Sequence, residues 1–130
     1  MGLFQYGDFV LNSGAKTKWK IDCDDLTLRD IKTLAFMGAQ LLPRFGGVAG
    51  VPKGGLLFAE AMRAYTSEGP WLGVDDVLTT GASMERVRAK LSTVDPVLGI
   101  VIFARGPFPD WVQAIFTMPE KLWLKQTANP

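Results

Sequence analysis

Two adjacent carboxylates and a turn of small residues stand together in the middle of this 130-residue chain. The stretch Trp71–Ser83 reads WLGVDDVLTTGAS, in which Asp75 and Asp76 precede Thr, Thr, Gly, Ala and Ser at 79–83. Where such a turn opens a helix, its backbone N–H groups point outward and the helix dipole favours an anion. Small side chains let a phosphate approach, and hydroxyls add hydrogen-bond donors. These residue types predict a phosphate site beside a pair of acids.

The residues on either side of the acids predict the elements that position this site. The apolar run Leu72–Val74 predicts a short buried strand that ends where the acids begin, and Met84–Leu91 predicts a helix after the turn. An aspartate after a strand is also commonly a solvated turn residue or a helix cap. The turn lacks the GK[ST] ending of a nucleoside-triphosphate P-loop, which argues against an ATPase or a GTPase.

A second glycine-containing turn precedes the first in the chain. Gly46–Val51 predicts a short buried strand, and Pro52-Lys53-Gly54-Gly55 then leads into a helix expected over Leu56–Tyr65. Glycine permits unusual backbone dihedrals and close approach of a ligand, and the following helix N-terminus attracts an anion. An ordinary Pro-Gly turn between a strand and a helix is the alternative interpretation.

Residues 27–42 predict the helix with the clearest periodicity. Its apolar positions share one face at helical spacing: Leu28, Ile31, Leu34, Ala35, Gly38, Leu41 and Leu42. Thr27 and Asp30 fit a capping box with Asp in place of Glu, and Pro43 ends the helix. We expect this helix to be scaffold that packs on a sheet.

Two further strands complete the expected architecture. The continuous apolar run Val97–Ala104 predicts a fully buried parallel strand, and Trp111–Thr117 predicts a last strand. Arg105 follows the first of them at its C-terminal end, where ligands bind in open α/β sheets, although a solvated strand-end cation is the alternative. The order of elements predicts an α/β fold with a parallel sheet flanked by helices. We expect one domain, with a hood segment over 1–24, an α/β core over 25–117 and a tail over 118–130.

Composition excludes several kinds of chemistry. The chain has no histidine and a single cysteine, Cys23, which rules out a Ser-His-Asp triad, a His-ligated zinc and a thiolate cluster. Any metal must have oxygen ligands, which favours Mg²⁺. The formal charge of +1 predicts no nucleic-acid partner. The longest apolar run is too short to cross a bilayer and no signal peptide is visible, so we expect a cytoplasmic protein without a membrane partner.

Joined at this spacing, the paired acids, the TTGAS turn and the GVPKGG loop resemble the signature of the type I phosphoribosyltransferases, which bind phosphoribosyl pyrophosphate (PRPP). The resemblance implies that Asp75 and Asp76 bind the ribose hydroxyls. It also implies that they bind Mg²⁺, either directly or through water or those hydroxyls. It implies a 5′-phosphate site made by Val77, Leu78, Thr79, Thr80, Gly81, Ala82 and Ser83. It implies a pyrophosphate site made by Val51, Pro52, Lys53, Gly54 and Gly55, a loop that often holds a non-proline cis peptide in this family. Adjacent residues of an extended chain point to opposite sides, so which acid faces the ligand stays open.

The N-terminal segment resembles one subfamily in particular. Residues 9–14 read FVLNSG and are followed by Thr17 and Asp22, which is similar to the FxLxSGxxS/T…D segment of orotate phosphoribosyltransferases. This resemblance places Ser13, Gly14 and Arg105 at the base, although Ala104 stands where that subfamily has an acid before the arginine. It places Lys16 near the pyrophosphate, whereas an exposed lysine at a hairpin tip is the alternative.

The resemblance also implies a reaction and partners. The expected activity is transfer of ribose 5-phosphate from PRPP to a nucleobase, orotate or a related pyrimidine, with release of pyrophosphate. Asp75, Asp76, Lys53 and Lys16 would be the catalytic residues, Mg²⁺ the cofactor and a homodimer the assembly. Such a reaction needs positioning and charge stabilisation more than proton transfer, which suits a chain without histidine. A purine-specific enzyme is a variant of the same hypothesis.

One part of the orotate enzymes is missing. They carry a mobile basic lid between the pyrophosphate-loop helix and the PRPP strand, whereas here only residues 66–70 join these elements, without a basic side chain. Lids of this kind exclude water and complete the charge stabilisation. A second hypothesis is therefore a PRPP- or nucleotide-binding regulatory module with weak or no turnover.

Overall fold

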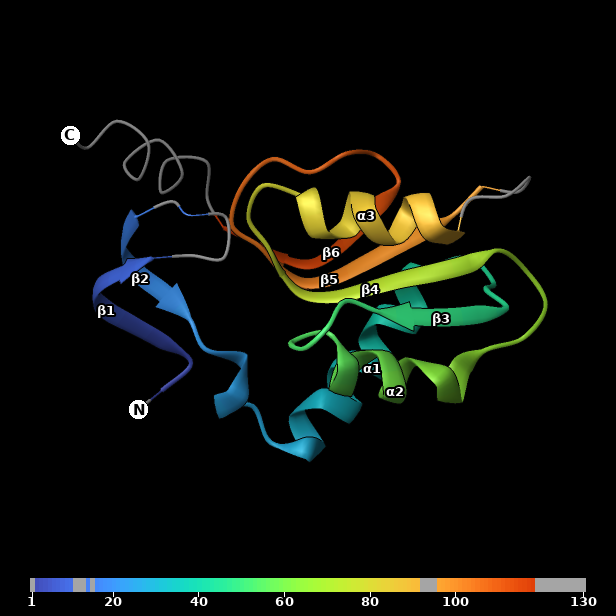
Figure 1. The fold of residues 1–130 in the computed structure, drawn as a ribbon. Helices are drawn as coiled ribbons and strands as arrows, with labels where there is room; N and C mark the ends of the chain where they lie inside the picture. Colours follow the sequence, from blue (N-terminus) through green and yellow to red (C-terminus); the bar gives the residue numbers. More distant parts are fainter. Residues whose placement is uncertain (1, 11–13, 15, 92–95, 119–130) are drawn as a thin grey trace.

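A parallel four-stranded sheet forms the centre of the molecule in a computed structural model that describes residues 2–10, 14, 16–91 and 96–118 (Figure 1). The strand order is β3-β4-β5-β6, with every neighbouring pair parallel. The strands are β3 (Gly47–Gly50), β4 (Trp71–Leu78), β5 (Leu98–Ala104) and β6 (Val112–Thr117). This arrangement confirms the α/β class and the parallel sheet predicted from the order of elements.

In the described part of the chain, three α-helices cover the sheet. They are α1 (Leu28–Leu41), α2 (Leu56–Met62) and α3 (Ala82–Leu91), with short 3₁₀ turns η1 (Cys23–Asp25) and η2 (Arg63–Tyr65). Helices α1 and α2 lie on one face and α3 lies on the other (Figure 1). The continuous helix expected over 56–65 is thus an α-helix that tightens into a 3₁₀ turn at its end, which is common at helix termini.

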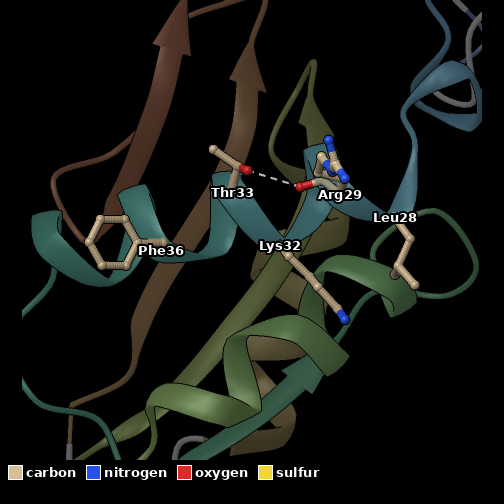
Figure 2. Close-up of a pocket in the computed structure, with 5 residues that line it drawn as sticks. All are labelled: Leu28, Arg29, Lys32, Thr33 and Phe36. Carbon is tan, nitrogen blue, oxygen red and sulfur yellow. Dashed lines mark hydrogen bonds between the residues drawn. The ribbon is translucent and has the colours of Figure 1, made fainter.

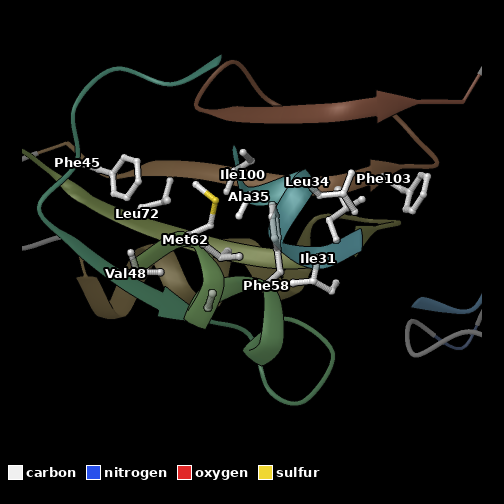
Figure 3. Packing of buried hydrophobic residues seen from close by; sticks show 13 residues of the cluster. Ile31, Leu34, Ala35, Phe45, Val48, Phe58, Met62, Leu72, Ile100 and Phe103 are labelled. Atoms are coloured by element: carbon white, nitrogen blue, oxygen red, sulfur yellow. The ribbon is translucent and has the colours of Figure 1, made fainter. Parts of the chain in front are cut away.

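The larger hydrophobic cluster fills the space between the sheet and helices α1 and α2 (Figure 3). Phe58 and Met62 of α2 are fully buried there, against Leu72 and Ile100 of the two central strands. A smaller cluster on the other face packs Met84 of α3 on Val101 and Ala104. Both central strands are therefore covered on both faces, which explains their nearly continuous apolar sequences.

An antiparallel hairpin stands apart from this sheet. Its strands are β1 (Phe4–Val10) and β2 (Lys16–Ile21), and it lies beyond the carboxyl ends of the parallel strands (Figure 1). Phe4 meets Phe103 of β5 edge-to-face with ring centroids 5.9 Å apart. The segment expected over 1–24 thus contains a hairpin that rests on the end of β5.

Two boundaries on either side of the turn after β4 differ from the sequence prediction by two residues or more. Strand β4 continues through both acids to Leu78, because its pairing with β5 extends to Leu78 and Ala104. Helix α3 begins at Ala82, two residues before the expected start at Met84. Both differences shorten the turn between strand and helix, so the acids lie within the strand and the turn that follows is tighter than predicted.

Helix α1 begins with the predicted capping box. The Asp30 backbone N–H donates to Thr27 Oγ1 at 3.0 Å, and the Thr27 N–H donates to Asp30 Oδ2 at 2.9 Å. We expect Thr27→Ala to lower the free energy of unfolding by about 1 kcal/mol, because one helix N–H loses its acceptor. Urea unfolding measures this change. Thr33→Ala is the control, since that exposed hydroxyl donates only to the Arg29 carbonyl within the helix; an equal loss in both variants would contradict the capping role.

Candidate functional site

The two acids occupy the C-terminal half of β4. Asp75 is only 7% exposed and Asp76 is half-buried. Each carboxylate accepts a backbone N–H from the next residue, Asp76 N–H to Asp75 Oδ1 at 2.8 Å and Val77 N–H to Asp76 Oδ1 at 2.7 Å. These bonds satisfy part of each carboxyl group inside the strand, which helps the strand to accommodate two acidic residues where the sequence predicted its end.

Burial changes the titration of the first acid. Loss of water around Asp75, together with a hydrogen bond to Asp76 and the charge of Asp76, raises the pKa of Asp75 from 3.8 to about 8. Near neutral pH this carboxyl therefore holds a proton in the ligand-free protein. Binding of cations beside it would favour the ionised form and release that proton.

This raised pKa predicts a pH dependence of stability. The folded protein holds the Asp75 proton more tightly than the unfolded chain does, so the free energy of unfolding falls as pH rises from about 4 to about 8 and then levels off. Asp75→Asn removes this contribution, and the variant should gain stability relative to the wild type across that window. Urea unfolding of both proteins from about pH 5 to about pH 9 measures the difference. Parallel curves for the two proteins would contradict the buried, protonated carboxyl.

The loop after β3 packs directly against the second acid. A Cβ added at Gly54 would stand 2.5 Å from Asp76 Oδ2, so only glycine lets the loop lie this close to the carboxylate. The loop is anchored by Val51 N–H donating to the Val74 carbonyl at 2.8 Å and by Gly55 N–H donating to the Val51 carbonyl at 2.9 Å. The peptide bond between Pro52 and Lys53 is cis. The predicted pyrophosphate loop and the predicted ribose-binding acids are therefore side by side.

The turn after β4 encloses a small hollow. Its volume is about 30 Å³, and it is lined by Asp75 and by residues 77–84. Gly81 adopts φ 87°, a conformation that favours glycine, and the Ala82 N–H donates to Thr80 Oγ1 at 3.3 Å. All the predicted 5′-phosphate residues lie around this hollow, at the N-terminus of a ten-residue helix.

Arg105 connects the sheet to the hairpin. Its side chain is 4% exposed, and Nη2 donates to Thr17 Oγ1 and to the Trp19 carbonyl, each at 3.1 Å. The guanidinium carbon lies 3.7 Å from the centre of the Trp19 ring, a cation–π contact. Burial lowers the pKa of Arg105 to about 10, so the group stays charged at neutral pH. Arg105 therefore holds strand β2 over the carboxyl end of β5.

The acids, both turns and the hairpin surround one cavity of about 300 Å³. Its lining from the predicted site consists of Val51, Pro52, Lys53, Gly54, Asp75, Asp76, Val77, Thr79, Ser83 and Arg105. Gly55 lies behind this lining at the N-cap of α2, and Leu78, Thr80, Gly81 and Ala82 line the smaller hollow. Most residues predicted from two separate segments of sequence thus meet around one space.

Two described residues of the predicted site, Lys16 and Gly14, are exposed and line neither the cavity nor the smaller hollow. Ser13 falls outside the described residues. The cavity instead includes Val10, Lys20 and Ile21 of the hairpin, which the sequence analysis did not single out. The lysines at every second position, 16, 18 and 20, were the sequence signal for a basic residue from this hairpin. The spacing does not reveal which of them approaches the cavity.

Cys23 lies close enough to the acids to be affected by their charges. Burial and the negative charges of Asp76, Asp22, Asp75 and Asp24 raise the pKa of its thiol to about 12. A thiol with so high a pKa is protonated and unreactive at neutral pH. Cys23 therefore packs against the larger core cluster and supplies no nucleophile.

The described residues contain no group of three or more carboxylate, cysteine or histidine side chains able to hold a metal ion. Asp75 and Asp76 supply two carboxyl groups, and Asp75 is protonated near neutral pH. Mg²⁺ commonly binds one or two carboxylates and completes its coordination with substrate oxygens and water. The acids fit a magnesium ion that arrives with a phosphorylated substrate, and do not form a complete protein cage.

A separate hollow of about 550 Å³ lies on the outer face of α1 (Figure 2). It is lined by Leu28, Arg29, Lys32, Thr33 and Phe36, and contains no predicted site residue. Its one drawn hydrogen bond, from Thr33 Oγ1 to the Arg29 carbonyl, is internal to the helix (Figure 2). The described helices include none that is long and apolar enough to cross a membrane.

Comparisons with known proteins find relatives in structure only. No family model and no curated protein sequence matches the chain. An orotate phosphoribosyltransferase from Aeropyrum pernix superposes with a TM-score of 0.68 and 24% identity, covering 95% of this chain and 91% of that one. One from Mycobacterium tuberculosis H37Rv gives 0.65 and 14%, covering 88% and 89%. A purine phosphoribosyltransferase from Pyrococcus horikoshii Ot3 gives 0.54 and 20%, covering 72% and 86%. These similarities establish the fold.

Proposed function

We propose that this chain, which has the type I phosphoribosyltransferase fold, transfers the ribose 5-phosphate group of PRPP to a nucleobase, orotate or a related pyrimidine, and releases pyrophosphate. The observation that carries the proposal is the convergence of two anion-binding turns and two acids around one cavity of about 300 Å³. PRPP has the matching parts, a monophosphate and a diphosphate on either side of two ribose hydroxyls.

Each wall of the cavity has a role in this proposal. The turn at 79–83 holds the 5′-phosphate through backbone N–H groups and hydroxyls, and the loop at 51–55 holds the pyrophosphate through its backbone amides. Asp76, whose carboxylate lies beside Gly54, accepts hydrogen bonds from the ribose hydroxyls. Asp75 is more buried than Asp76 and borders both the cavity and the phosphate hollow, so it contacts the ribose from the protein interior.

The reaction breaks the bond between ribose C1 and the pyrophosphate oxygen and forms a bond from C1 to a ring nitrogen of the base. Pyrophosphate leaves with the electron pair of the broken bond, and the ring nitrogen gives its proton to water. Negative charge grows on the leaving group, so fixed cations and oriented N–H groups lower the barrier. Lys53 on the pyrophosphate loop provides one such cation, and Lys16 stays a candidate for another. Mg²⁺, held by Asp76 and the substrate's own oxygens, would neutralise part of the pyrophosphate charge.

The hairpin forms one wall of the cavity through Val10, Lys20 and Ile21. Arg105 fixes this hairpin and borders the cavity, so we propose that it positions the base, together with Gly14 and Ser13 as the resemblance implies. The similar solved structures include enzymes named for orotate and for purines, and the base is therefore a matter for assay.

A regulatory PRPP-binding module is the second candidate function. It is favoured by the short link between η2, which ends at Tyr65, and β4, which begins at Trp71. The link at 66–70 carries Glu68 and no basic residue, so it brings no cation to the site. Without a lid, water enters more easily and transfer is expected to be slow.

One experiment separates the two candidates. Pyrophosphate release is followed after mixing the protein with PRPP, Mg²⁺ and orotate, uracil, adenine or guanine, while calorimetry measures PRPP binding. Release that depends on orotate, and stops on removal of Mg²⁺ by chelation, supports the transferase. Tight PRPP binding without release from any base supports the module, and absence of PRPP binding contradicts both.

We further propose that the chain acts as a homodimer, as the resemblance implies. Sedimentation velocity distinguishes one 14.2 kDa chain from two. A single-chain mass at the concentrations used for the assay would contradict this assembly.

A further inference from the structure

Strand β2 of the hairpin carries three alternating lysines in different surroundings. Lys16 and Lys18 are exposed, and Lys18 pairs with Asp8 of strand β1. Lys20 is half-buried and borders the cavity that contains Asp75 and Asp76. Because residues 16, 18 and 20 share one face of the strand, their spacing does not distinguish them, and the position of the hairpin alone selects Lys20 as the lysine that borders the site.

The Lys20 ammonium rests against an aromatic ring in the ligand-free protein. Its Nζ lies 4.9 Å from the centre of the Phe9 ring. A cation–π contact of this kind is weak when it is exposed to water. A diphosphate offers a much stronger charge-assisted hydrogen bond, and the long lysine stem allows the ammonium to move to it.

Few cations border the cavity. Among the described residues of its lining, the basic side chains are Lys20, Lys53 and Arg105. Arg105 is fixed by its bonds to Thr17 and Trp19 and by the Trp19 ring. Lys53 stands on the pyrophosphate loop and Lys20 on the hairpin, so the two ammonium groups come from different walls of one space.

We propose that Lys20 is a substrate-binding residue that, together with Lys53, holds the diphosphate of PRPP between two cations. The inference rests on the proposed function and specifies how the site works without a basic lid. A cation on the hairpin is present before the substrate arrives, whereas a lid must close to deliver one. As pyrophosphate leaves C1 and gains charge, Lys20 stabilises that charge, and the same contact strengthens binding of free pyrophosphate.

The test is a calorimetric titration of inorganic pyrophosphate with Mg²⁺, and of PRPP with Mg²⁺, into the whole chain. Lys20→Gln should raise the dissociation constant for pyrophosphate about tenfold, the loss of one charge-assisted hydrogen bond. Lys20→Arg should keep most of the affinity because it keeps the charge. Lys18→Gln is the matched control on the same strand and should stay within about twofold of the wild type.

Each outcome decides the inference. Pyrophosphate affinity of Lys20→Gln equal to that of Lys18→Gln, in a protein that binds PRPP, would overturn the role of Lys20 and leave the proposed function standing. If Lys20→Gln had normal pyrophosphate affinity but a raised KM for the base, Lys20 would belong to the base site. That result would also overturn its role at the diphosphate. A wild-type protein that binds neither pyrophosphate nor PRPP would refute the proposed function itself. Equal unfolding midpoints of the two glutamine variants exclude misfolding as the cause of a loss.

Discussion

The Asp76→Asn variant is expected to bind PRPP about 10- to 100-fold more weakly than the wild type while it keeps its fold. Asp76 is half-buried and borders the cavity, with one carboxylate oxygen accepting the Val77 N–H and the other close to Gly54. Asparagine preserves the shape and the bond from Val77, but it removes the charge that would bind the ribose hydroxyls and a substrate-bound Mg²⁺ in the proposed function. Hydrogen bonds to charged groups are worth about 1.5–3 kcal/mol, which sets the size of the expected effect.

Calorimetry with PRPP and Mg²⁺ measures this loss directly. Asp110→Asn is a suitable control, because Asp110 is exposed and lies outside the described lining of the cavity. Equal dissociation constants for the wild type and Asp76→Asn would remove Asp76 from the ligand site. A fall in the unfolding midpoint of Asp76→Asn by many degrees would instead identify the carboxylate as structural.

The Arg105→Met variant should lose about 3–5 kcal/mol of stabilisation of the docked hairpin. Methionine fills much of the same space but gives up the bonds to Thr17 Oγ1 and the Trp19 carbonyl and the contact with the Trp19 ring. The remaining attachment of the hairpin includes Phe4 on Phe103 and the packing of Leu3 and Ile21 on the larger core cluster. The hairpin should therefore separate from β5 while the parallel sheet stays folded.

Amide hydrogen exchange reports this separation segment by segment. Protection should fall in strands β1 and β2 and persist in β4 and β5 of Arg105→Met. The protection of the hairpin in Arg105→Lys should lie between that of the wild type and that of Arg105→Met. A lysine keeps the charge but not the planar fork that reaches both acceptors. Unchanged protection of the hairpin in Arg105→Met would show that the arginine does not hold it.

The local sequence was sufficient to predict the core elements of this fold. The capping box at Thr27 and Asp30 and the apolar run of β5 are short-range signals, and the structure contains both elements as predicted. The two turns were also predictable from local sequence. The small side chains and glycines at 52–55 and 79–83 determine the backbone conformation of the turns in which they lie. The structure places these turns and the acids around one cavity.

Features that depend on distant partners were not predictable in the same way. Strand β4 continues through Asp75 and Asp76 because β5 offers pairing partners as far as Ala104, and local propensity alone favours a turn at two aspartates. Arg105 is buried because Thr17 and Trp19, almost ninety positions earlier, lie above it. Lys20 borders the cavity for the same reason, since only the docked position of the hairpin distinguishes it from Lys16 and Lys18.

A crystal structure of the chain with PRPP and Mg²⁺ tests the central claim most directly. The account predicts the 5′-phosphate in the turn at 79–83, the ribose hydroxyls at Asp76 and the diphosphate between the loop at 51–55 and Lys20. PRPP bound at a different place, or no PRPP in crystals grown at a saturating concentration, would contradict it.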